Sequence, residues 1–461
     1  MPRLEDPVTI GDLRVPNRLY RAPLLECAGN GPDAVDALID DLEPAAAAGA
    51  GLLCQGATIV TASGGCAAPK MTRVADPEFV ARLERLTDRI HDHGARIVLQ
   101  LEHGGLRSME TWHAGYREER PDLRQVAVSE PPLALRLADR AGLLSYDPVV
   151  LSTGEVYDLA DRFGEVAGWA ADAGYDGIHL AGANMGLVQQ FLSPYYNRRD
   201  DEFGGSPRDR VRFLGEVYRA IRERTDVPVM TKLPAETAAP WFARPRLSLR
   251  DGLRTAELLD ETGFEALVPV ETSTFWDQSI VRGEYPERAW TDESLQAGYE
   301  AAFGSRLRAR LVRLANRIHA RDFEFEPAWN ARFCRWVRER VDATVLCEGG
   351  VRERPRIDRL LGAADAPPTD DPVVDGRACD MVGMARPFYA EPRLPARLLG
   401  AGSERAATVC ESCNNCTVPQ VTGEPGVCRT PSVLAEHGRL RKAGAYERPD
   451  TADAEESTAD D

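Results

Sequence analysis

The sequence predicts an α/β protein whose core is a (β/α)8, or TIM, barrel, with a cysteine-bearing extension after the last strand. Short apolar runs alternate with amphipathic helical stretches along most of the 461 residues. Such alternation is typical of parallel strands joined by crossover helices. Many helical stretches end in Gly just before the next apolar run, as helices often do. Eight such units in one chain favour a closed barrel over an open sheet.

The expected strands divide the chain into a barrel, an insertion and an extension. In chain order, the strand candidates are residues 18–22, 51–60, 95–101, 177–183, 227–233, 266–271, 343–347 and 380–384. The stretch 284–336 is too long for one connection and predicts extra helices within a barrel that covers residues 1–390. Residues 391–438 form the expected extension. Residues 364–375 read as an exposed acidic loop, and the acidic tail, 439–461, is expected to be disordered.

The composition narrows the class of protein and its surroundings. Asp and Glu exceed Lys and Arg by 73 to 56, a net charge of −17. This charge argues against nucleic acid as a partner, because phosphate binding needs a basic surface. Only Lys70, Lys232 and Lys442 are lysines, which leaves 56 − 3 = 53 arginines. An acidic, lysine-poor surface suggests a halophilic protein in a salty cytosol, where salt screens self-repulsion. An acidic protein from a GC-rich genome is the alternative.

The apolar pattern and the cysteines favour a cytoplasmic protein. No apolar run is long enough to span a bilayer, and the N-terminus lacks the apolar core of a signal peptide. We therefore expect neither a membrane nor a secretory route. The scattered cysteines fall in apolar or loop segments and predict free, structural thiols. They are Cys27, Cys54, Cys66, Cys334, Cys347 and Cys379.

The remaining cysteines form a compact motif near the C-terminus. Cys410, Cys413, Cys416 and Cys428 have the spacing C-x2-C-x2-C-x11-C. Structural zinc sites usually consist of two separated C-x2-C pairs. Three cysteines in one tight wrap with a more distant fourth are more typical of a 4Fe–4S cluster. The motif therefore predicts an iron–sulfur centre and redox chemistry, with zinc or incidental cysteines as the alternatives.

Several segments at the expected strand ends carry a resemblance to a known family. They are PNRLYRAPL, LQLEHGG, AGYDGIHLAGANMGLVQQFLSPYYNRRDDEFGGSPRDRVRFLGEV, CEGGV and DMVGMARPFYAEPRLP. With the cysteine motif, they resemble the iron–sulfur branch of the Old Yellow Enzyme-like NADH:flavin oxidoreductase family, which includes trimethylamine dehydrogenase and 2,4-dienoyl-CoA reductase. The resemblance spans about residues 5–435 and implies an FMN-dependent oxidoreductase.

The resemblance also implies where FMN binds. TIM-barrel sites lie at the carboxyl ends of the strands, and phosphate commonly binds after strands seven and eight. The implied FMN-binding residues are Ala22, Pro23, Leu24, Ala57, Gln100, Lys232, Gly349, Gly350, Gly383, Met384, Ala385 and Arg386. A Lys inside an apolar strand is costly unless paired, so Lys232 suggests a role at the flavin, with a buried ion pair as the alternative. Leu25 replaces the cysteine that bonds the flavin in trimethylamine dehydrogenase, so non-covalent FMN is expected.

The residues that meet the substrate depart from the family pattern. The polar pair after the fourth strand becomes Ala181 and Asn184, and the usual proton-donating Tyr becomes Gly186. Asn184 can still form hydrogen bonds, whereas Ala181 cannot. His179 and His103 are the other candidate catalytic residues, although core histidines are the plainer interpretation of both.

We therefore expect an FMN- and 4Fe–4S-dependent oxidoreductase acting on a small molecule, either by oxidative demethylation of an amine or by reduction of an activated alkene. No G-x-G-x-x-G motif follows a strand. A separate electron-transfer protein or NAD(P)H-oxidising subunit is therefore the expected partner. Relatives are often dimers, so a homodimer is one expectation. The alternative is a non-catalytic binding barrel with a structural zinc on the four cysteines.

Overall fold

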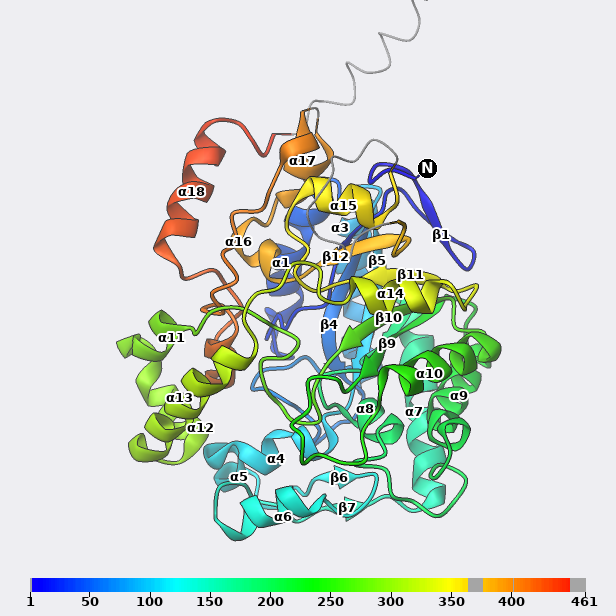
Figure 1. Ribbon diagram of the computed structural model, residues 1–461, viewed down its shortest axis with the longest axis vertical. Coiled ribbons are helices and arrows are strands. Elements are labelled where there is room, and N and C mark those ends of the chain that lie inside the picture. Colours follow the sequence, from blue (N-terminus) through cyan, green and yellow to red (C-terminus); the bar gives the residue numbers. More distant parts are fainter. Residues whose placement is uncertain (1, 364–375, 401, 448–461) are drawn as a thin grey trace, which may run out of the picture.

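The computed structural model describes residues 2–363, 376–400 and 402–447. At its centre is a closed barrel of eight parallel strands (Figure 1). In chain order they are β3 (Leu19–Arg21), β4 (Leu52–Ile59), β5 (Arg96–Glu102), β8 (Gly177–Leu180), β9 (Val229–Ala235), β10 (Ala266–Glu271), β11 (Thr344–Cys347) and β12 (Met381–Met384). Each corresponds to an expected strand, so the predicted TIM barrel is confirmed. The predicted loop at 364–375 lies outside the described residues.

Helices connect the strands around the outside of the barrel. They are α1 (Ala34–Ala47), α2 (Pro77–Arg82), α3 (Glu84–His91), α7 (Thr153–Asp172), α9 (Pro207–Arg222), α10 (Leu249–Thr262), α14 (Ala331–Arg338) and α15 (Arg354–Leu360). Local sequence sets several of their starts. Capping boxes of Ser152 with Glu155 and of Ser206 with Asp209 begin α7 and α9.

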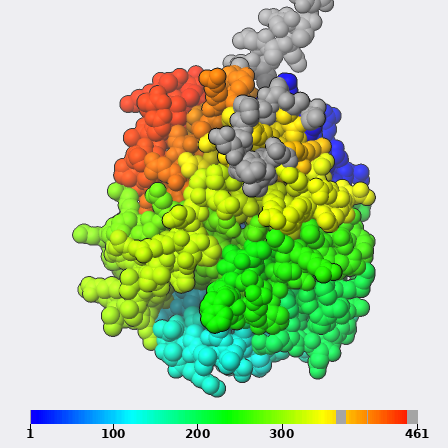
Figure 2. All heavy atoms as spheres, viewed as in Figure 1, coloured from blue at the N-terminus to red at the C-terminus, as the bar shows by residue number. Residues whose placement is uncertain are grey.

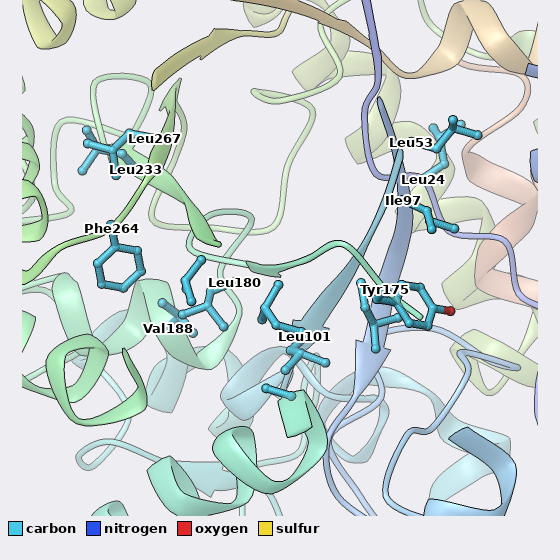
Figure 3. Packing of buried hydrophobic residues seen from close by; sticks show 14 of the residues in the cluster. Leu24, Leu53, Ile97, Leu101, Tyr175, Leu180, Val188, Leu233, Phe264 and Leu267 are labelled. Carbon is cyan, nitrogen blue, oxygen red and sulfur yellow. The ribbon is translucent and has the colours of Figure 1, made fainter. Parts of the chain in front are cut away.

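Alternation along the strands separates two apolar layers. In β5, Ile97, Leu99 and Leu101 point outward into the core between strands and helices, whereas Val98 points into the barrel. Figure 3 shows part of the outer core, where Leu101, Leu180 and Val188 lie close to one another. Inward positions near the carboxyl ends are polar, so the same alternation carries functional groups into the barrel mouth.

Loops at the mouth contain additional short elements. After β5 come η1 (Gly105–Arg107), α4 (Met109–Trp112), α5 (Ala114–Glu119), β6 (Val126–Ala127), α6 (Leu133–Arg140) and β7 (Val149–Val150), and after β8 comes α8 (Leu187–Leu192). Before β3, β1 (Val8–Ile10) and β2 (Leu13–Val15) form an antiparallel hairpin.

The insertion has the expected extra helices. They are α11 (Glu287–Thr291), η2 (Glu293–Leu295), α12 (Gln296–Phe303), α13 (Arg306–His319) and η3 (Ala320–Asp322). The expected range 284–336 also includes most of α14, which contacts β10 and β11 and belongs to the barrel wall. The insertion lies beside the C-terminal extension along one side of the molecule (Figure 2).

The extension follows β12 and continues farther than expected. It contains α16 (Arg386–Ala390), α17 (Leu394–Leu399), η5 (Ser403–Arg405), η6 (Val418–Thr422) and α18 (Pro431–Lys442). Helix α18 crosses the expected boundary at 438, and Tyr446 is buried with its hydroxyl donating to Glu391 Oε1 at 2.7 Å. The rest of the predicted tail, 448–461, lies outside the described residues. Among the described residues, no helix is long and apolar enough to cross a membrane.

Candidate active site and cysteine pocket

A layer of polar side chains points into the barrel just below its mouth. Gln100 on β5 is paired in register with His179 on β8, and Lys232 on β9 faces the same interior. Gln100 accepts a hydrogen bond from the Ala57 N–H at 3.0 Å, and its amide nitrogen lies 3.0 Å from His179 Nδ1. With Nδ1 accepting, the proton of the neutral ring is on Nε2, which is buried and has no partner. Gln100 therefore orients His179.

Burial keeps His179 neutral. The ring is fully buried, and both burial and the nearby Lys232 hold its pKa well below the usual value. A neutral imidazole with a free N–H is a hydrogen-bond donor into the barrel rather than a base at neutral pH.

Lys232 forms an ion pair that the sequence analysis mentioned only as an alternative. Its Nζ lies 2.7 Å from Glu348 Oε2, the residue directly after β11, and both side chains are largely buried. Lys232 lies in the middle of β9, which continues to Ala235. Glu348 Oε1 is buried without a partner. Glu348 was not predicted as a site residue, although it is a charged residue directly after an apolar strand.

A second charged group stands at the mouth itself. Glu102 ends β5, is buried, and lies 3.5 Å from Arg107 NH1, while its Oε1 has no hydrogen-bond partner. Burial raises the pKa of Glu102, and Arg107 and Lys232 oppose this rise. Neither Glu102 nor Arg107 was predicted as a site residue.

Arg107 binds Asn184, the residue that the family resemblance places beside the substrate. Its NH1 donates to the Asn184 carbonyl oxygen at 2.8 Å. With its amide oxygen turned toward Arg107, the Asn184 side chain accepts from NH1 at 2.8 Å and NH2 at 3.0 Å. Asn184 and Met185 both have left-handed backbone, with φ of 68° and 60°. Such consecutive strained residues often occur at functional sites. Asn184 is thus held by Arg107 and does not project freely into the mouth.

Glu102 also explains the glycine at position 186. A Cβ added to Gly186 would lie 3.1 Å from Glu102 Oε1. The carboxyl therefore fills the space into which a larger residue at 186 would begin. The glycine at position 186 and the Glu102 carboxyl therefore belong to one arrangement.

His103 does not share the interior with the other candidates. Its Nδ1 accepts from the Gly105 N–H at 3.1 Å, and its ring packs against Gly65, where any side chain would collide with it. Burial lowers its pKa to about 4, so the ring is neutral. These contacts turn His103 toward the loop after β4, and its expected catalytic role stays a prediction.

Aromatic rings border the mouth beyond Arg107. The Arg107 guanidinium lies 5.2 Å from the ring centroid of Trp276, which in turn lies 5.0 Å from that of Trp112. Trp276 is 42% exposed, so one side of this pair is open.

The two glycines after β11, where a phosphate is expected to bind, have left-handed backbone. Gly349 and Gly350 have φ of 94° and 69°, and a Cβ on Gly350 would lie 2.2 Å from the Glu326 carbonyl oxygen. Only glycine suits this turn. Gly383 differs, because its Cβ would meet Tyr20 and Glu348 at 2.8 Å. Gly383 therefore allows close packing inside the barrel.

The small residues expected around the flavin ring line the same end of the barrel. Ala22, Leu24 and Ala57 are buried, and Ala22 N–H donates to the Met384 carbonyl oxygen at 2.9 Å. The remaining expected neighbours are Pro23 and Ala385. Small side chains, the glycine turn, and the unpartnered His179 and Glu348 atoms fit a flat polar ring with a phosphate tail.

Arg386 is turned toward the extension. Its guanidinium donates to Asn414 Oδ1 and to the Arg282 carbonyl oxygen, the latter at 2.8 Å. These contacts tie Arg386 to the cysteine loop and the insertion, and its expected contact with a phosphate stays a prediction.

The four motif cysteines line one small pocket. Ser412 and Asn414, which alternate with the cysteines, have left-handed backbone with φ of 60°. Cys410 and Cys416 are buried, while Cys413 and Cys428 are half-buried. Burial raises the pKa of Cys416 to about 12, and Arg386 opposes this rise. The other six cysteines are free and buried, as expected.

The spacing within this pocket bears on which group it fits. Among the described residues, no group of three or more His, Cys, Asp or Glu stands arranged to hold a metal ion. A single zinc draws its thiolates to about 2.3 Å from one centre. In a cubane each thiolate binds a different iron, so the sulfurs lie farther apart. Four thiolates lining one pocket are a donor set that a 4Fe–4S cluster or a zinc ion could use.

The fold and the strand-end site define a flavin-dependent oxidoreductase. The chain belongs to the NADH:flavin oxidoreductase / NADH oxidase family, whose model matches residues 3–244. This range holds the Gln100, His179 and Lys232 layer. FMN is accordingly the family's cofactor for the barrel site.

Relatives differ in how much of the chain they share. An NADH oxidase of Thermoanaerobacter brockii is 26% identical over 443 residues, which cover 92% of this chain and 57% of the relative. An NADPH dehydrogenase of Geobacillus sp. strain WCH70 is 27% identical over 362 residues, covering 76% of this chain and 98% of the relative. The structure of histamine dehydrogenase from Rhizobium sp. 4-9 shares the fold at a TM-score of 0.67 and 20% identity, covering 94% of this chain and 53% of that one.

Proposed function

We propose that this chain is an FMN- and 4Fe–4S-dependent oxidoreductase that exchanges hydride with a small molecule and passes single electrons through the cluster. The observation that carries the proposal is the pocket lined by Cys410, Cys413, Cys416 and Cys428. Arg386 links this pocket to the end of β12, next to the barrel mouth. A flavin supplies hydride and single-electron chemistry when bound, and a cluster moves electrons singly.

The interior layer would serve the flavin. Lys232 brings a positive charge below the mouth, where it would stabilise a reduced, anionic ring. Glu348 holds the ammonium in place at 2.7 Å, and Gln100 holds His179 with its free N–H directed into the barrel. The turn at Gly349 and Gly350 would take the phosphate on its backbone N–H groups, since neither residue carries a side chain of its own.

Glu102 is the group that we assign to proton exchange with the substrate. It is the carboxyl nearest to Gly186, where relatives carry a Tyr, and its Oε1 has no hydrogen bond, only the ion pair with Arg107 at 3.5 Å. Burial raises its pKa, which brings the carboxyl closer to a proton-exchanging role near neutral pH. Arg107, which is itself bound to Asn184, lies 3.5 Å from Glu102 at the mouth.

Two substrate classes fit this mouth. An amine is favoured by the buried Glu102 carboxyl together with the open ring of Trp276, since aromatic faces attract cations. Histamine dehydrogenase, which shares the fold, acts on an amine by its name. An activated alkene is favoured by Arg107, which could hold the oxygen of a conjugated carbonyl group. A separate redox protein would exchange electrons with the cluster in either case.

An anaerobic absorbance spectrum of the purified protein tests the cofactors, together with an iron assay and analysis of the flavin released by acid. The expected result is FMN with about four irons per chain and bleaching by dithionite. A Cys428→Ser variant is expected to lose the iron and keep the flavin, because the pocket lies outside the barrel. Zinc in place of iron, with no flavin, would support the alternative of a non-catalytic barrel with a structural metal.

Anaerobic mixing then separates the substrate classes. Histamine or trimethylamine is expected to bleach the oxidised flavin if the substrate is an amine. Cyclohexenone or cinnamate is expected to restore the colour of the dithionite-reduced flavin if the substrate is an alkene. Activity with neither set would contradict both classes.

A further inference from the structure

Helix α13 presents an apolar stripe to solvent. None of its residues is buried, and its large apolar side chains are 54–67% exposed. They are Leu307, Leu311, Leu314 and Ile318. Spacings of four, three and four residues place these side chains along one face of the helix, as in the seam of a coiled coil. Contiguous exposed apolar surface of this kind usually marks an interaction site.

The opposite face of α13 packs against the rest of the protein. The exposed stripe is therefore not the face by which the helix is anchored. Ala309 and Val312 pack in a cluster around Trp290, whose indole N–H donates to Asn316 Oδ1 at 2.9 Å. The same cluster includes Val418 and Val421 of η6. The inner face therefore holds the helix in place, and the stripe stays exposed to solvent in the part of the chain that the structure describes.

The charge of the helix points to an acidic partner. Its five arginines are Arg306, Arg308, Arg310, Arg313 and Arg317, and it contains no acidic residue, in a chain of net charge −17. Arg306, Arg310, Arg313 and Arg317 follow one edge of the stripe. Arg306 pairs with Glu300 and Arg313 with Glu287, both at 2.9 Å, so among the described residues Arg310 and Arg317 carry the charge that this edge offers to a partner. Pairing with α13 of a second copy would set arginines against arginines, which disfavours that partner. A complementary acidic surface would instead be attracted to this edge.

The stripe also lies on the side of the molecule that carries the cysteine pocket. Helix η6, against which the α13 cluster packs, begins two residues after Cys416. Val427, next to Cys428, and Leu434 on α18 are 45% and 46% exposed. Figure 1 places α11, α12, α13 and α18 along this side.

We propose that the α13 stripe is the docking surface for an acidic single-electron carrier protein, which receives or delivers the electrons of the cluster. This inference rests on the proposed function. The apolar stripe would bind the partner, and the arginine edge would steer it toward the side that holds the cluster.

The test uses the full chain with its cofactors and flavodoxin as an acidic carrier. Electron transfer from the dithionite-reduced protein to flavodoxin is followed by stopped-flow absorbance. We expect Leu311→Ser/Leu314→Ser and Arg310→Glu/Arg317→Glu each to slow this reaction by about tenfold or more, because they remove the apolar contact or reverse the steering charge. The control is Leu133→Ser/Leu137→Ser, which changes an equally exposed leucine pair on α6 and leaves the rate unchanged.

Two further measurements keep the outcomes distinct. The electron paramagnetic resonance signal of the reduced cluster reports the proposed function, and its absence in the wild type would contradict that function. With the signal present, unchanged rates in both stripe variants, or no saturable reaction of the wild type with flavodoxin, would overturn the docking proposal. A dimer by light scattering that the leucine variant converts to a monomer would overturn it too, because a second copy would then cover the stripe.

Discussion

Single buried residues at the barrel mouth are held by partners from neighbouring strands and loops. Lys232 is paired with Glu348, His179 with Gln100, and Glu102 with Arg107. Without their partners, the charges of Lys232 and Glu102 would each cost several kcal/mol in the interior, at about the level known for buried ions. The pairing therefore fixes the positions of these side chains, and their positions decide which part of a bound flavin or substrate each one would face.

Replacing Glu102 by Gln tests its assignment as the proton-exchanging group. We expect turnover with the reactive amine or alkene to fall by about 10²- to 10⁴-fold, the usual contribution of a positioned acid or base. Flavin content is expected to stay unchanged. The measurement is the anaerobic rate of flavin reduction or reoxidation across pH.

The matched control is Glu110→Gln. Glu110 is another buried carboxylate, whose Oε1 accepts from the Gly65 N–H at 3.0 Å, away from Gly186. Equal losses in the two variants would argue that any buried carboxylate matters for folding alone, and would refute the specific role of Glu102.

His103 gives the stability a predictable dependence on pH. Its pKa is about 4 in the fold, against 6.5 ordinarily, because the ring is buried. Below pH 6.5 the unfolded chain therefore binds a proton that the fold does not. Stability from this group is complete above pH 6.5 and is lost as pH falls toward 4. Each pKa unit is worth about 1.4 kcal/mol, so the loss amounts to about 3 kcal/mol.

The non-titrating variant His103→Gln checks this expectation. Urea unfolding at several pH values is expected to give wild type a steeper loss of unfolding free energy than the variant between pH 6.5 and 4. Parallel curves for the two proteins would show that His103 titrates normally in the fold.

At the scale of elements, close helix packing holds the barrel wall together. A Cβ on Gly164 of α7 would lie 2.6 Å from the carbonyl oxygen of Ala220 in α9. Gly215, also in α9, has nothing within 4 Å of its added Cβ. Close packing therefore requires glycine at position 164, whereas the space beside Gly215 would admit a side chain.

Substituting each by Ala should have opposite effects on stability. Gly164→Ala is expected to destabilise the protein by about 1–3 kcal/mol, because the helices must move apart. Gly215→Ala is expected to stabilise it by about 0.5–1 kcal/mol, because Ala favours the helix and meets open space. Thermal unfolding of the two variants beside wild type measures the difference. A destabilised Gly215→Ala would contradict the open space beside α9.

The insertion and the extension form a second unit of organisation, outside the barrel wall. Helix α12 packs against α5 and η6, so it bridges the loop after β5 and the segment after Cys416. Arg386 makes a further link by donating to the Arg282 carbonyl oxygen and Asn414. The mouth and the cysteine pocket are thereby mechanically connected.

For the whole molecule, the net charge of −17 predicts a dependence on salt. Self-repulsion destabilises a compact acidic chain, and salt screens it. Raising KCl from about 0.1 M to about 2 M should increase the midpoint of thermal unfolding by several degrees. Differential scanning fluorimetry with matched sucrose controls measures the change. A midpoint that stays constant or falls would contradict the halophilic interpretation.

The sequence by itself determined the barrel and the cysteine motif. Strand and helix periods are local properties, so alternation along β5 places Val98 inside and Leu99 outside wherever the strand lies. Cys410, Cys413 and Cys416 are close in the chain, so their spacing predicts one site without knowledge of the fold. The glycine pair at 349 and 350 was visible for the same reason.

Only the tertiary structure decided the partners of the charged groups. Lys232 and Glu348 are 116 residues apart, and Glu102 meets Gly186 across two strands. Arg386 follows a predicted phosphate loop yet turns to Asn414, because a long side chain can take either direction from one backbone position. Contacts between distant residues depend on the closure of the barrel. Local pattern therefore predicted which residues reach the mouth and the extension, and packing decided what each one binds there.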